Sequence, residues 1–107
     1  MQFNHKTITS SGDSELSLSA AEAEAYHGQV RTIERLLICN TDSTEITVDL
    51  WLDDGTNEFM MLDGTSIPVG VTLDFLNGIP FAYDAKYSVK VKLGNSGYTA
   101  DIIYNEY

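Results

Sequence analysis

The sequence predicts an all-β fold, an antiparallel β-sandwich or jelly roll of about eight short strands with an N-terminal arm. Short segments in which apolar and polar residues alternate recur along the chain, and turn-forming pairs such as Asp54-Gly55 and Asn77-Gly78 separate them. No long helical pattern alternates with these segments, which argues against a parallel sheet covered by helices. The length of 107 residues fits one domain of ordinary size.

The N-terminal part of the chain has the weakest pattern. We expect residues 1–28 to form a partly irregular arm and residues 29–107 to form the sandwich domain. Within the arm, alternation at 3–9 predicts an edge strand, and residues 15–20 predict a second short strand. Residues 21–28 have the propensity of a helical turn, and an irregular connection is the equal alternative.

The longest apolar segment lies at 30–39. Strict alternation places Leu36 and Ile38 on one face and Ile33 on the other, together with Arg31 and Arg35. A helix is the alternative here, because short apolar runs are ambiguous. The turn residues that follow at once, and the clear strand after them, favour a strand.

The segment 46–53 contains the single tryptophan of the chain. Alternation turns four residues toward the core: Ile46, Val48, Leu50 and Leu52. Trp51 falls on the opposite face between Asp49 and Asp53, so it is expected to be exposed in the single chain. Three alternatives give it a role: a protein interface, a cover by the N-terminal arm or over a sheet edge, or a platform for a sugar.

The rest of the chain continues as short strands. Residues 58–62 are expected to pair with 46–53 across the Asp54-Gly55 turn, and 63–70 is expected to be a turn-rich joint in which Pro68 limits pairing. Extended segments follow at 71–76 and 79–85. The segment 86–94 turns four residues inward, Tyr87, Val89, Val91 and Leu93, and residues 98–107 form the last strand.

Charge is the strongest bulk property. The formal net charge is −10, and residues 1–63 hold twelve acidic and three basic side chains. Binding of nucleic acid through phosphate contacts needs clustered Lys and Arg, so no nucleic-acid partner is expected. No apolar run reaches the roughly 20 residues of a membrane span, and the N-terminus lacks the apolar core of a signal peptide. We therefore expect no membrane partner and synthesis in the cytoplasm, with Cys39 as a small buried apolar residue.

The sequence contains no catalytic motif. His5 and His27 are its only histidines, and no nucleophile, zinc or phosphate-loop motif is present. The acidic turn "DDGTNE" lacks the spacing of an EF-hand loop. A pair of carboxylates of the glycosidase kind stays an open alternative, although most carboxylates fall in turns or at outward positions. We expect no enzyme activity, no cofactor and no metal.

Aromatic residues are the most informative candidates for a site. Tyrosine and tryptophan anchor many protein interfaces, because they bury a large area at low entropic cost. The candidate interface residues are Trp51, Tyr98, Tyr104 and Tyr107.

Residues 30–104 also resemble a pattern found in small virion structural proteins of tailed bacteriophages, including cyanophages. The matching features are the Cys39-Asn40 pair at a strand end, "TVDLWL" at 47–52, "IPVGVTL" at 67–73, and "YSVKVK" at 87–92 before an alternating final strand. These motifs are turn and strand chemistry, and they include no catalytic residue. The first 28 residues lie outside the matching part.

The resemblance implies a β-sandwich subunit that is built into a virion. Its expected role is a capsid decoration (cement) subunit on the particle exterior, made in the host cytoplasm. Its expected partners are the major capsid protein or other virion subunits, together with copies of itself, with a trimer favoured. A head–tail neck or tail accessory subunit of the same fold, and a carbohydrate-binding host-recognition module built on Trp51, are the alternatives.

Overall fold

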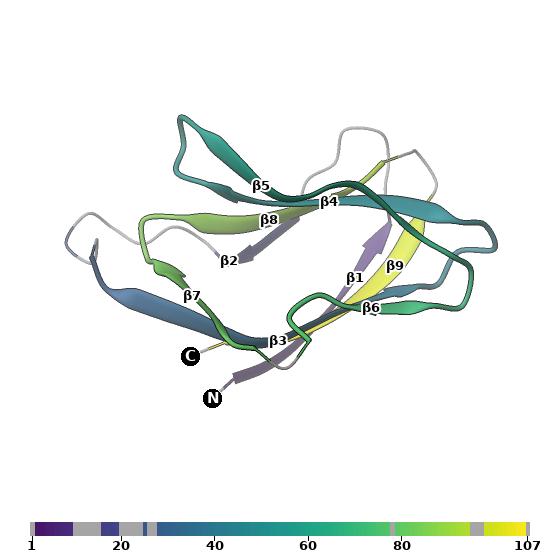
Figure 1. Cartoon of the computed structure of the whole chain (residues 1–107), viewed down its shortest axis with the longest axis horizontal. Helices are drawn as coiled ribbons and strands as arrows, with labels where there is room; N and C mark the ends of the chain where they lie inside the picture. The colour runs from purple at the N-terminus through teal and green to yellow at the C-terminus, as the bar shows by residue number, and fades with distance from the viewer. Residues whose placement is uncertain are drawn as a thin grey trace.

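The computed structural model describes the chain in six ranges: residues 2–9, 16–19, 25, 28–77, 79–94 and 98–106. These residues form two antiparallel sheets and contain no α-helix (Figure 1). The predicted all-β class with antiparallel pairing is therefore confirmed. The strand number of the whole chain and the N-terminal arm stay predictions.

The first sheet is built around the longest strand, β3. Its members in order are β1 (Gln2–Thr9), β9 (Thr99–Glu106), β3 (Val30–Asn40) and β6 (Thr72–Asp74), with β7 (Phe81–Asp84) also on β3. The strand β9 occupies one edge of β3. The opposite edge is shared, since β6 pairs with residues 37–39 and β7 pairs with residues 30–33.

The second sheet has the order β2 (Leu16–Ser19), β8 (Ser88–Leu93), β4 (Ile46–Asp53) and β5 (Glu58–Ile67). The predicted hairpin at Asp54-Gly55 joins β4 to β5, and Gly55 has a φ of 94° that suits glycine. Among the described strands, β2 and β5 are the two edges of this sheet.

Both strands that the sequence predicts near the N-terminus are present. The strand β1 pairs along its whole length with β9, and β2 pairs with β8. The predicted helical turn at 21–28 lies outside the described residues, except for Ala25 and Gly28. The division into an arm at 1–28 and a domain at 29–107 stays a prediction.

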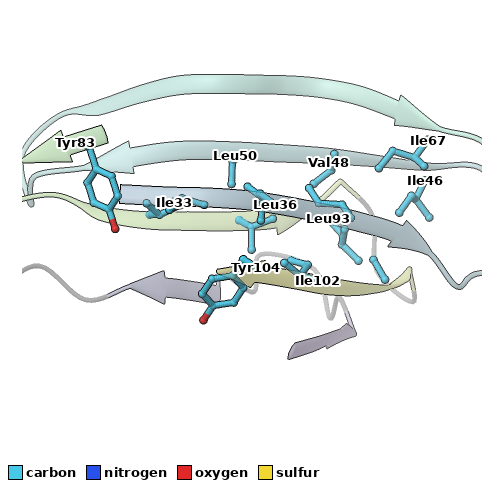
Figure 2. Packing of buried hydrophobic residues seen from close by; sticks show 14 residues of the cluster. Ile33, Leu36, Ile46, Val48, Leu50, Ile67, Tyr83, Leu93, Ile102 and Tyr104 are labelled. Atoms are coloured by element: carbon cyan, nitrogen blue, oxygen red, sulfur yellow. The ribbon is translucent and has the colours of Figure 1, made fainter. Parts of the chain in front are cut away.

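One apolar layer lies between the two sheets (Figure 2). The second sheet contributes Ile46, Val48 and Leu50 from β4, and Val89, Val91 and Leu93 from β8. The first sheet contributes Ile33, Leu36 and Ile38 from β3, and Ala100, Ile102 and Tyr104 from β9. The inward faces predicted for 46–53 and 86–94 are therefore confirmed, with Leu52 and Tyr87 partly buried against the layer.

The strand β3 departs from strict alternation. Ile33 lies in the core with Leu36 and Ile38, although the sequence places it on the opposite face. The register against β9 shifts between Ile33 and Arg35, so one extra residue is inserted there. Such a β-bulge reverses the inward and outward positions beyond it, and the predicted face of Ile33 is therefore wrong.

The strand β5 is longer than predicted. It continues through 63–67, where the sequence indicates a turn-rich joint. Gly64 has a φ of 62° at a register shift, and its N–H donates to Asp49 Oδ1 at 2.6 Å. The pair Asp63-Gly64 thus forms a bulge within a strand, and β5 ends only before Pro68.

Asn40, the second residue of the Cys39-Asn40 pair, has a structural role at the end of β3. Its buried side chain donates from Nδ2 to Thr44 O and to Ile67 O, both at 2.9 Å. Its Oδ1 accepts from Asp42 N at 2.8 Å. One side chain at the end of β3 therefore holds the turn into β4 and the end of β5. Cys39 beside it is half-buried, not fully buried as expected.

Replacing Asn40 tests this role. We expect Asn40→Ala to lower the free energy of unfolding by about 2–3 kcal/mol, because it leaves two carbonyls and one N–H near the core without their partner. Urea denaturation followed by circular dichroism measures the change. Ser43→Ala, at an exposed position of the same turn, should stay within about 0.5 kcal/mol of the wild type. Equal stability of Asn40→Ala and the wild type would contradict the assignment.

Candidate functional site

Trp51 is buried in the single chain. Only 3% of its surface is exposed, so the expectation that it is exposed is wrong. It does lie on the predicted outer face of the second sheet, because its neighbours Leu50 and Leu52 point to the core. Its cross-strand partners are Met60 on β5 and Lys90 on β8. Long side chains on neighbouring strands can cover an outward ring, and alternation alone does not reveal this.

A small surface cavity of about 130 Å³ lies beside Trp51. Its lining residues come from three adjacent strands and are Asp49, Trp51, Glu58, Met60 and Lys92. The structure thus brings together Asp49 and Trp51, as the sequence predicts, and adds Glu58, Met60 and Lys92. The buried Nε1 of Trp51 has no hydrogen-bond partner. An unmade hydrogen bond of this kind costs stability, commonly about 1–3 kcal/mol.

Asp53, the other predicted neighbour of Trp51, is occupied by contacts within the chain. Its Oδ2 lies 2.9 Å from Lys90 Nζ, and its Oδ1 accepts from Gly55 N at 2.7 Å. The hydrogen bond from Lys90, followed by that from Gly55, lowers the pKa of Asp53 below its ordinary value. Asp53 therefore stabilises the hairpin and is not directed to a ligand.

Two other aspartates hold turns in a similar way. Asp54 Oδ1 accepts from Thr56 N at 2.9 Å and from Asn57 N at 2.7 Å, and the bonds from Asn57 and Thr56 lower its pKa. For Asp42, partial burial raises the pKa, but hydrogen bonds from Thr44 and Thr99 outweigh it, so the pKa lies below the ordinary value. In the acidic turn "DDGTNE", Asp53 and Asp54 thus use their carboxylates to cap the backbone of the turn itself.

Two of the three candidate tyrosines, Tyr98 and Tyr104, lie in the described part of the chain, and neither is exposed. Tyr104 is 2% exposed and belongs to the core, so it cannot anchor an interface in the folded chain. Tyr98 is partly buried against the same core. Tyr107 lies outside the described residues. For Tyr104, the alternation of the last strand carries the signal of an inward position.

A different region exposes large apolar side chains. It comprises β5, the connection 68–71, β6, and residues 75–77 and 79–81, and we call it the open side. It includes five of the six exposed large apolar residues of the described chain, namely Phe59, Met60, Val69, Val71 and Ile79. The connection 68–71 joins the edge strand of one sheet to an edge strand of the other, so β5 and β6 border the same side of the molecule (Figure 1). These residues are the candidates for an interaction surface in the described part of the chain.

The sequence contains an indication of the open side, although it lies outside the alternating patterns that predict the strands. Val69 and Val71 flank Gly70 in a predicted turn, where polar residues are the rule, and Ile79 follows a turn pair directly. The stretch 58–81 also contains three acidic residues, Glu58, Asp63 and Asp74, and no basic residue. The open side is therefore both apolar and acidic.

The described residues lack two other kinds of feature. In that part of the chain, no helix is both long and apolar enough to cross a membrane. No three His, Cys, Asp or Glu side chains within the described ranges are grouped so that they could share a metal ion.

No protein-family model, curated protein or solved structure matches the chain. The resemblance to phage structural proteins therefore stays a prediction from the motifs quoted above.

The burial of Trp51 is directly measurable. We expect its fluorescence emission to be shifted to the blue and poorly quenched by acrylamide, since water does not reach the ring. We also expect Trp51→Ala to lower the free energy of unfolding by about 3–5 kcal/mol. Trp51→Phe is the matched control and should cost clearly less, because it keeps an aromatic ring and removes the unpaired N–H. Quenching as efficient as that of free tryptophan would contradict the buried position.

Acid should weaken the fold through the aspartates that cap turns. A carboxylate whose pKa is lowered by folding stabilises the native state fully above its unfolded pKa of about 4, and this contribution disappears as the pH falls through the folded value. We therefore expect Asp42→Asn to be less stable than the wild type at pH 7, with a gap that narrows below about pH 4. Urea midpoints across this range measure the gap.

Ser43→Ala is the control for this experiment, because it alters the same turn without adding or removing a titrating group. Its difference from the wild type should not change with pH. A gap for Asp42→Asn that stays constant from pH 7 to about pH 3 would mean that hydrogen bonding to Asp42 does not lower its pKa.

Proposed function

We propose that the protein is a non-enzymatic bacteriophage virion structural protein, specifically a capsid decoration subunit on the particle exterior. The observation that supports this proposal best is the open side, where five large apolar side chains between the start of β5 and the start of β7 are exposed. A chain that acts alone gains nothing from such exposure, whereas a subunit of an assembly buries it against its neighbour.

The finer description of the fold belongs to the same proposal. Two antiparallel sheets with one apolar layer between them correspond to a β-sandwich, the fold that the phage resemblance implies. In this proposal the N-terminal arm at 1–28, which includes β1 and β2, also acts as a clamp on a neighbouring subunit.

The exterior of the particle suits the charge of the chain. A subunit of net charge −10 on the inner wall would face packaged DNA and be repelled by it. On the outer surface the same charge favours solubility and keeps particles apart.

Two alternatives are kept. A neck or tail accessory subunit would use the same fold and the same open side, and copy number per particle separates it from a decoration subunit, because a ring closes with few copies. A carbohydrate-binding module is less well supported, because a Trp51 ring that is 3% exposed offers no face on which a sugar can stack.

The proposal is tested by mass measurement in two steps. Light scattering of the purified protein gives its oligomeric state, for which we expect a trimer. Co-sedimentation with capsid shells stripped of accessory proteins then measures binding, for which we expect saturation at many copies per shell. Saturation at a single ring of copies would favour the neck or tail position. A protein that remains monomeric and binds no shell would overturn the structural role.

A further inference from the structure

The chemistry of the open side points to one kind of partner. We propose that the open side docks a partner protein through an extended, apolar segment that carries lysine or arginine. This inference rests on the proposed function, since it names the chemistry of the surface that the subunit recognises.

The edge position of β5 and the exposed side chains on it favour an extended segment as the part of the partner that docks. The strand β5 is an edge of its sheet, so one row of its N–H and C=O groups faces away from β4. Phe59 packs edge to face on Tyr87, with ring centroids 5.9 Å apart, and it is still about half exposed. The neighbouring side chain of Met60 is exposed on the other face of the strand. An added strand could therefore bury apolar groups on both sides of its own backbone.

The bulges of β5 limit how such a strand can pair. The register against β4 shifts on both sides of Leu50, near Met61 and near Gly64. Bulges interrupt the regular edge and thereby oppose open-ended addition of identical strands. A short segment, held at the Glu58–Met60 end and by side-chain contacts, fits this edge better than a long continuous ladder.

Charge selects a basic partner over a second copy. The stretch 58–81 holds three acidic and no basic residues. A two-fold contact of the open side with itself would set Glu58, Asp63 and Asp74 against the same residues, which is unfavourable. A lysine or arginine would be attracted to Glu58, which lines the Trp51 cavity together with Asp49 and Met60. The cavity thus brings together the carboxylates of Asp49 and Glu58, the thioether of Met60 and the ammonium group of Lys92. Asp49 Oδ1 already accepts from Gly64 N, so Glu58 is the main attraction for a basic side chain.

Synthetic peptides of the length of β5 test the proposal on the full chain. In one peptide lysine alternates with valine, and in the matched peptide glutamate replaces lysine. We expect the lysine peptide to bind at least about tenfold more tightly, with an affinity that falls as salt is added. Backbone amide shifts measured by NMR should map to residues 58–81. Equal binding of the two peptides, absence of binding, or shifts confined to another surface would overturn the proposal.

Two variants of matched exposure sharpen the test. Ile79 is 72% exposed on the open side, and Val30 is 70% exposed outside it. We expect Ile79→Ser to weaken the lysine peptide about tenfold and Val30→Ser to leave its affinity unchanged. Neither residue contributes to the core, so both variants should fold. Equal effects of the two variants would overturn the assigned surface.

The outcomes separate this inference from the proposed function. If the wild type binds capsid shells and Ile79→Ser binds them equally well, the docking surface is wrong and the structural role stands. If the wild type binds the lysine peptide but no shell, the structural role fails and the docking chemistry stands. An oligomer of the protein alone that Ile79→Ser breaks apart would show that a second copy covers the open side, and would overturn the proposal.

Discussion

The hydrogen bonds of Asn40 connect the two sheets, and much of the structure depends on them. Asn40 ends β3 in one sheet, and its amide donates to Ile67 O at the end of β5 in the other. The same amide donates to Thr44 O, and its oxygen accepts from Asp42 N, so the short turn into β4 is set in place as well. A buried amide with all these partners stabilises one arrangement, because any shift between the sheets leaves polar groups unpaired. The core side chains of β3 and β4 then face each other in a fixed register.

This constraint also shapes the surface that we propose as functional. With the end of β5 held by Asn40, the chain passes directly through Pro68 and Gly70 to β6, and Asn40 N donates to Val71 O at 3.0 Å. Val69 and Val71 are thereby held at the border between the sheets with their side chains exposed. The open side thus lies between strands of the two sheets, with β5 on one flank and β6 on the other.

Much of the fold could be predicted from the sequence, because alternation reports which face of a strand is buried. Leu50, Val89 and Val91 illustrate this, since their inward positions follow from period-two patterns. Ile33 could not be placed, because a bulge shifts the pattern by one residue, and its position is set by pairing with β9 at the far end of the chain. The candidate site was harder to predict. The alternating pattern places Trp51 on the outer face of its sheet, but neighbours on other strands cover it. Exposure depends on such tertiary contacts, and a pattern within one strand does not contain them.

The pairing of β1 with β9 has a consequence for how the protein is made. Gln2 lies opposite Glu106, so the first and last strands of the described chain are partners in one sheet. Three core residues, Ala100, Ile102 and Tyr104, come from β9. A growing chain therefore lacks both the partner of its first strand and three residues of its apolar layer until β9 has been made. The native fold cannot form before β9 has been synthesised, and it forms at the slower rates typical of contacts between distant parts of a chain.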